Sequence, residues 1–256
     1  MRLCVAIPCF FRSLPFGEAI ETVASLGYDA AEIYDWTRLD FPSAKAALQK
    51  NKVELLSMCT TEFCMTDPAY RESWLRGLRE SCRAARELGV KRLITQVGAD
   101  TGAPRAEQHA AIVETLRCAI PILGEYGVTL MPEPLNTLVD HKGYYLTASG
   151  EAFSILREVD HPLVRLVFDI YHQQISEGNI LPNLLQNLPL VAHLHAAGHP
   201  GRIEPWLGES DYRVILSRLS VAGYTGACGL EYRPTLDPIE SLGRARELYG
   251  GTYGIS

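Results

Sequence analysis

The sequence predicts a single (β/α)₈ barrel of the TIM-barrel class that extends over residues 1–256. Short apolar runs alternate eight times with amphipathic segments, the order expected of a parallel sheet whose strands are connected by helices. The runs are apolar almost throughout, as in strands that are buried on both faces. The chain also has the size of one such barrel, because 256 residues that are 47% hydrophobic can fill one large core.

The apolar runs place the strands at regular intervals. We expect strands at about 2–8, 29–34, 53–58, 91–97, 128–133, 164–169, 190–196 and 226–232. A doubly wound sheet is the alternative architecture. It would need a glycine-rich phosphate loop after the first strand, and the segment PCFFRSLPFG is not one.

Amphipathic segments fill the intervals between these strands. We expect helices at about 16–26, 42–51, 68–88, 105–126, 148–158, 173–187, 210–222 and 237–249. Trp74, Leu78, Cys82 and Ala85, for example, recur at spacings of three and four, on one face of a helix. Four of the expected helices are followed by a glycine in the short connection to the next strand. These glycines fit the left-handed position that ends a helix: Gly27, Gly89, Gly127 and Gly223.

Three acids and one imidazole lie at the C-terminal ends of the last four apolar runs. Glu133, Asp169, His195 and Glu231 lie 36, 26 and 36 positions apart, close to the length of a strand–helix repeat. Residues at the carboxyl ends of barrel strands point into the active-site mouth, so these four side chains should converge. One such acid could simply mark the point where a strand enters a loop. Four at repeat spacing favour a divalent metal site, with Mg²⁺ or Mn²⁺ expected and Zn²⁺ or Co²⁺ also compatible.

Two of these acids are also the candidate catalytic residues. Strands five and eight lie on opposite sides of a barrel mouth, so Glu133 and Glu231 would flank a substrate from both faces. Such a pair can remove a proton on one side and return one on the other, or at the neighbouring carbon. The sequence has no GxSxG or HExxH motif that would indicate another mechanism.

Four further residues are candidates for substrate binding. His172 follows Asp169 by three positions, and Arg202 and Glu204 lie in the loop after His195. An arginine is the natural bidentate partner of a substrate carboxylate. A solvated surface arginine is the alternative, and the position of Arg202 after the strand-seven ligand favours substrate binding. Asn136 could bind the substrate or stabilise its turn. His193 has the same orientation as His195 by strand alternation, and we expect it to be a core histidine.

The composition restricts the partners and the compartment. The net charge of −6 and the lack of a basic stripe argue against nucleic acid, and no apolar run approaches the ~20 residues of a membrane span. Seven cysteines without a CxxC motif are expected to be reduced thiols of a cytoplasmic protein. We therefore expect a small-molecule substrate. The sequence does not decide whether the chain forms a homo-oligomer.

Several stretches resemble the xylose-isomerase-like barrel superfamily of sugar isomerases and epimerases, and within it the hydroxypyruvate isomerase subgroup. They are PEPLN at 132–136, FDIYHQQ at 168–174, HLHAAGHPGRIEP at 193–205, GES at 208–210 and GLEYRP at 229–234. The resemblance covers most of the chain and is sharp after residue 128. It implies a divalent metal on the four strand-end residues, Glu133 and Glu231 as the acid/base pair, and His172 and Arg202 as substrate-binding residues.

The resemblance implies aldose–ketose isomerisation through an enediolate, with hydroxypyruvate and tartronate semialdehyde as the expected pair. Two departures concern the substrate: Gly198 stands where the subgroup usually has an acid, and LLSMCTTEF lacks the histidine common at the end of the third strand. A ketose 3-epimerase, or an inosose-type isomerase or dehydratase, is the alternative on the same metal site. A non-catalytic sugar-binding barrel is the alternative of another class, and the intact acid pair argues against it.

Overall fold

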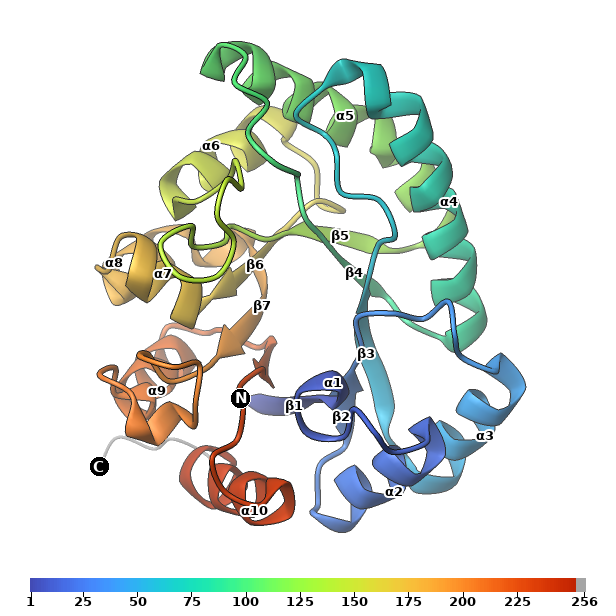
Figure 1. Cartoon of the computed structure of the whole chain (residues 1–256), viewed down its shortest axis with the longest axis vertical. Helices are drawn as coiled ribbons and strands as arrows, with labels where there is room; N and C mark the ends of the chain where they lie inside the picture. The colour runs from blue at the N-terminus through green and yellow to red at the C-terminus, as the bar shows by residue number, and fades with distance from the viewer. Residues whose placement is uncertain (252–256) are drawn as a thin grey trace.

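The computed structural model describes residues 1–251 and shows a parallel eight-stranded barrel (Figure 1). The strands are β1 Arg2–Ala6, β2 Ala30–Glu32, β3 Glu54–Cys59, β4 Arg92–Thr95, β5 Thr129–Pro132, β6 Leu166–Asp169, β7 Val191–Ala196 and β8 Ala227–Leu230. Seven of them lie within the ranges that the apolar runs predict, and β3 extends one residue beyond its predicted range, to Cys59. The fold is therefore the expected (β/α)₈ TIM barrel, and the end of the expected domain, 252–256, lies outside the described residues.

The strands follow one another around the barrel in the order β5-β4-β3-β2-β1-β8-β7-β6. β5 and β6 close the ring through a short parallel bridge between Leu130 and Val164. The amide of Leu130 donates to Leu163 O at 2.8 Å, and the amide of Arg165 donates to Leu130 O at 3.0 Å. This seam has fewer backbone hydrogen bonds than the continuous ladders elsewhere in the sheet.

The helices surround the strands (Figure 1). They are α1 Ile7–Phe10, α2 Phe16–Ser25, α3 Phe41–Asn51, α4 Arg71–Leu88, α5 Arg105–Tyr126, α6 Ser149–Val159, α7 Ile170–Ser176, α8 Ile180–Asn187, α9 Tyr212–Val221 and α10 Pro238–Tyr249. Large apolar side chains between helices and strands, such as Trp74, Phe153 and Phe168, are fully buried and form the core. Within residues 1–251, none of the helices has the length and apolarity required to cross a membrane.

The expected glycine positions are confirmed, because Gly27, Gly89, Gly127 and Gly223 all have positive φ, between 64° and 90°. An αL residue ends a helix and turns the chain toward the next strand, and glycine adopts this conformation without steric cost. These turns set where each following strand begins.

One helix prediction was wrong. The segment 173–187 forms two helices, α7 and α8, instead of one. Gly178 at φ 63° and Asn179 at φ 51° interrupt it with two successive left-handed residues, which cannot continue a right-handed helix. α7 also begins at Ile170, three residues earlier than expected, because the Asp169 side chain caps it.

Candidate active site

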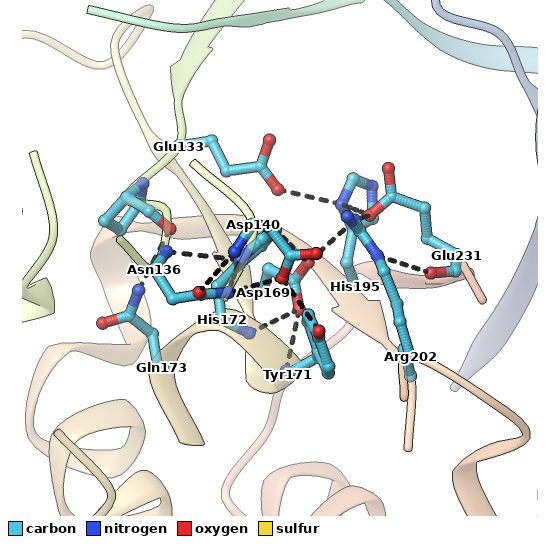
Figure 2. Close-up of polar contacts among 12 residues, drawn as sticks. Glu133, Asn136, Asp140, Asp169, Tyr171, His172, Gln173, His195, Arg202 and Glu231 are labelled. Carbon is cyan, nitrogen blue, oxygen red and sulfur yellow. Dashed lines mark hydrogen bonds and ion pairs between the residues drawn. The ribbon is translucent and has the colours of Figure 1, made fainter. Parts of the chain in front are cut away.

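Glu133, Asp169, His195 and Glu231 converge at the carboxyl ends of their strands (Figure 2). One ligand atom of each lies within 4.8 Å of those of the other three, and all four residues are buried. His195 is central. Its Nδ1 lies 3.0 Å from Glu133 Oε1 and 3.3 Å from Glu231 Oε2. The four residues that the sequence places at strand ends are thus brought together.

The sheet fixes the direction of the two glutamates. Each directly follows a strand and continues its pairing, because the amide of Glu133 donates to Thr95 O and that of Glu231 donates to Ala196 O, both at 3.1 Å. Their side chains therefore keep the orientation of strand residues and point inward.

Asp169 has two functions, one for each oxygen. Its Oδ1 caps α7 by accepting from the amides of Tyr171 at 2.8 Å and His172 at 3.2 Å. Its Oδ2 has no hydrogen-bond partner in residues 1–251 and is directed at the cluster. Burial, with the nearby charge of Glu231, raises the pKa of Asp169 to about 6.

The cluster fits a divalent cation. Three carboxylates and one imidazole are a donor set for a hard or borderline ion. Three buried carboxylates this close together repel one another, and a cation would offset that repulsion. Asp169 Oδ2 is a buried acceptor that receives no hydrogen bond within residues 1–251, so it is free to bind a cation.

Arg202 supplies a positive charge beside the cluster. Its Nη2 lies 2.5 Å from Glu231 Oε2 and 3.7 Å from Asp169 Oδ2, and its guanidinium lies over the Tyr171 ring at 5.3 Å from the ring centre. Burial alone would lower the pKa of Arg202, but the carboxylates of Glu231 and Asp169 hold it above its ordinary value. The sequence-predicted arginine thus lies in the site instead of on the solvated surface.

His172 presents a proton donor to the cavity. Its Nδ1 accepts from the backbone amide of Asn136 at 3.2 Å and lies 2.7 Å from Asn136 Nδ2. The proton of the neutral ring therefore belongs on Nε2, which has no hydrogen-bond partner in the described chain and lies 3.5 Å from Asp169 Oδ2. Burial lowers the pKa of His172 to about 4, so the ring is neutral at pH 7.

The structure does not bring Asn136 and Glu204 to the cavity wall. Asn136 lies behind His172, and its Oδ1 accepts from the amides of Val139 and Asp140, so it stabilises its turn and orients the histidine. Glu204 is fully buried, and its oxygens accept from Thr235, Leu236 and Ser241. It connects the loop after β7 to the segment after β8.

A cavity of about 990 Å³ opens above the cluster. Phe10, Trp36 and Phe63 contribute apolar walls, and His172 and Arg202 contribute polar ones. This volume exceeds what a three-carbon acid needs, so the distal part of the cavity can hold solvent or a longer substrate.

Sequence reasoning missed two residues of the second strand segment. Tyr34 donates to Glu231 Oε1 at 2.6 Å, and Glu32 contacts both histidines of β7, His193 at 2.9 Å and His195 at 3.3 Å. His193 is buried, as expected, and Glu32 is its partner. The signal in the sequence was the acid in the middle of the apolar run AAEIY, where a strand buried on both faces would otherwise carry none.

The fold and the site together define a barrel of the enzyme type, with acids and an imidazole gathered at the carboxyl ends of its strands. The chain belongs to the xylose isomerase-like TIM barrel family, whose profile matches residues 20–248. It is 29% identical to hydroxypyruvate isomerase of Escherichia coli (strain K12), over 91% of this chain and 94% of that protein. It is 32% identical to 2-oxo-tetronate isomerase of Cupriavidus necator, over 70% of each.

Solved structures share the fold. A crystal structure described as an AP endonuclease of family 2 from Brucella melitensis superposes with a TM-score of 0.91 at 23% identity, covering 97% of this chain and 99% of that one. A structure described as IOLI protein with a bound zinc atom superposes with a TM-score of 0.80 at 18% identity, covering 97% and 96%. At these identities the likeness concerns the fold alone.

Proposed function

We propose that the chain is a divalent-metal-dependent isomerase of small keto acids, and that it interconverts hydroxypyruvate and tartronate semialdehyde. The observation that carries this proposal is the pair of buried glutamates, Glu133 and Glu231, which contact His195 in a cluster that could hold a cation at the base of the cavity. The relatives named hydroxypyruvate isomerase and 2-oxo-tetronate isomerase support a keto acid as the substrate class.

Glu133, Asp169, His195 and Glu231 would hold the metal ion. When bound, the ion supplies Lewis-acid stabilisation of negative charge that develops on substrate oxygens. A donor set with one imidazole and three carboxylates accepts Mg²⁺ or Mn²⁺ and is also compatible with Zn²⁺ or Co²⁺.

The two glutamates would carry the protons. In the forward direction one carboxylate removes a proton from C3 of hydroxypyruvate, which gives an enediolate. A proton is then delivered to C2, and the hydrogen of the C3 hydroxyl ends on the oxygen at C2, so that C3 becomes the aldehyde. The formula is unchanged, as an isomerisation requires.

Arg202 and His172 would bind and orient the substrate. The guanidinium of Arg202 offers a charged fork to the substrate carboxylate, and His172 Nε2–H is an unpartnered donor in the cavity wall. Both groups lie beside the cluster, so the substrate oxygens would be held between them and the acid pair.

Proton exchange in D₂O followed by NMR tests this function. Hydroxypyruvate, four-carbon keto acids and C5–C6 ketoses would each be incubated with the Mn²⁺-loaded protein, the metal-free protein and no protein. We expect metal-dependent deuterium uptake at C3 of hydroxypyruvate, with formation of tartronate semialdehyde. Exchange confined to C3 of a ketose would instead support the 3-epimerase, and no exchange on any substrate would refute an enolising enzyme.

A further inference from the structure

Glu32 occupies an unusual place for a carboxylate. It lies on β2 inside the barrel, 1% exposed, and belongs to none of the four strand ends that form the cluster. Its Oε2 accepts from Ser57 Oγ at 2.7 Å and lies 2.9 Å from His193 Nε2. Its other oxygen, Oε1, lies 3.3 Å from His195 Nε2. Burying a carboxylate is costly, and Ser57 and His193 compensate only for Oε2. Neither Glu32 Oε1 nor His195 Nε2 has a hydrogen-bond partner in residues 1–251, and the two atoms face each other at 3.3 Å.

The two nitrogens of His195 face opposite sides. Nδ1 faces the carboxylates of Glu133 and Glu231, whereas Nε2 faces Glu32. A neutral imidazole has one donor nitrogen and one acceptor nitrogen. If the proton is on Nε2, the lone pair of Nδ1 is directed at the cluster, as a metal ligand requires.

We propose that Glu32 is a positioning residue that holds the proton of His195 on Nε2 and fixes the ring, so that Nδ1 is the metal-binding atom. The proposal rests on the proposed function, because it assumes that the cluster binds a metal. Ser57 and His193 fix the carboxylate through Oε2 and leave Oε1 for His195. A carboxylate that only satisfied His193 in the core would not need its second oxygen directed at the ligand.

The neighbouring strand is compatible with this contact only because it carries a glycine. A Cβ on Gly229 of β8 would lie 2.3 Å from Glu32 Oε1 and 2.7 Å from His195 Cδ2. Any other residue at 229 would push the carboxylate or the ring out of place. The space in which Glu32 meets His195 is thus made by the sequence of three strands, β2, β7 and β8.

Metal affinity tests the proposal, because a purely structural role would leave it unchanged. Mn²⁺ binding would be measured by calorimetry for the wild type, Glu32→Gln and Ser57→Ala. Glu32→Gln keeps the volume but replaces a strong acceptor, and we expect Mn²⁺ affinity to fall by about 10- to 100-fold. Ser57→Ala is the graded comparison: it removes one of the two contacts that fix Oε2 but keeps the carboxylate of Glu32, so we expect Mn²⁺ affinity to fall less than in Glu32→Gln.

A second test uses the wild-type protein, so its outcome does not depend on whether a variant folds. In Zn²⁺-loaded protein labelled with ¹⁵N-histidine, the NMR pattern of His195 should show a proton on Nε2 and metal at Nδ1. Metal at Nε2, or Glu32→Gln affinity within threefold of the wild type, would overturn the proposal while leaving the metal site intact. Two ions per chain would also overturn it, because Glu32 would then be a ligand. A wild type that binds no divalent ion would refute the proposed function itself, and this inference with it.

Discussion

Glu133 and Glu231 lie on either side of His195 in different electrostatic surroundings. Burial raises the pKa of Glu133. Burial acts on Glu231 in the same direction, but His195 and Arg202 outweigh it and hold the pKa of Glu231 well below its usual range. Two carboxylates whose pKa values are pushed apart are suited to opposite proton-transfer roles. In the metal-free protein, Glu231 is the group that stays ionised and Glu133 is the one more easily protonated.

Replacement of either glutamate by glutamine should remove nearly all turnover. An amide can still ligate a cation weakly but cannot accept and return a proton, so the loss should persist when the metal is saturating. Steady-state kinetics of Glu133→Gln and Glu231→Gln at saturating Mn²⁺ would measure this. Glu125→Gln, which alters an exposed ion pair with Arg79, is the control and should have wild-type activity. A variant that retains more than about a tenth of the rate would assign its glutamate to ligation only.

Arg202→Ala should raise the KM for hydroxypyruvate by on the order of 10- to 150-fold, because a charged hydrogen bond is worth ~1.5–3 kcal/mol. Arg202→Lys should recover only part of the loss, since the planar fork is absent. Arg233→Ala is the control, because Arg233 also lines the cavity but is exposed.

Arg202 also contacts Glu231, so its loss alone could disturb the acid pair. A neutral ketose distinguishes the two effects: if Arg202 binds the carboxylate, the ketose should lose less than hydroxypyruvate. An equal loss on both substrates, together with faster turnover of the ketose by the wild type, would exclude the keto-acid assignment.

At the scale of the element, the strands and their terminal ligands could be predicted because they depend on short-range patterns. An apolar run that ends in an acid specifies both a buried strand and the side chain at its carboxyl end. Contacts between distant strands leave no such pattern. Glu32 meets His193 and His195, more than 160 positions later, and Ser57 on the next strand, so only the closed barrel reveals the network. The break at Gly178 and Asn179 was likewise missed, because their left-handed geometry outweighs the helical periodicity.

Glu204 shows how a loop beside the site is held. We expect Glu204→Gln to lower the free energy of unfolding by about 2 kcal/mol at pH 7, because hydrogen bonds to a charged acceptor are replaced by weaker ones. Chemical denaturation would measure it. Glu209→Gln, an exposed acid in the same loop, is the control and should change stability by less than about 0.5 kcal/mol. An unchanged stability in Glu204→Gln would show that the loop is held by its other contacts.

The contribution of Glu204 should also depend on pH. Burial would raise its pKa, but hydrogen bonds from the Leu236 and Thr235 amides and the Thr235 hydroxyl outweigh this and hold the pKa below its usual value. The unfolded chain therefore binds the proton more readily than the folded one. The stabilisation is present above the unfolded pKa of ~4.3 and is lost as the pH falls through the folded pKa. The difference between wild type and Glu204→Gln should accordingly shrink as the pH falls from 7 to about 3.

At the scale of the whole molecule, the strand pairing of the barrel is weakest between the two strands that carry two of the proposed metal ligands. β5 and β6 are joined by one short bridge, whereas the other neighbouring strands form ladders. Glu133 follows β5 and Asp169 ends β6, so two ligands stand on opposite sides of this seam. An ion bound by both would connect the two strands across it.

Metal binding should therefore stabilise the fold and protect the seam in particular. At a free concentration of 100 times Kd, a ligand specific for the folded state adds ~2.7 kcal/mol, which corresponds to a rise in Tm of roughly 5–10 °C for a chain of this size. Calorimetry with Mn²⁺ and with a chelator would measure the rise. Hydrogen exchange would locate it, with the amides of Leu130 and Arg165 slowed more than those of the β1–β8 ladder. In Asp169→Asn the metal ligand on β6 is weaker, so Mn²⁺ should no longer slow hydrogen exchange at the Leu130 and Arg165 amides more than in the β1–β8 ladder. Equal slowing of all strand amides in the wild type would mean that the ion stabilises the barrel without bridging β5 and β6.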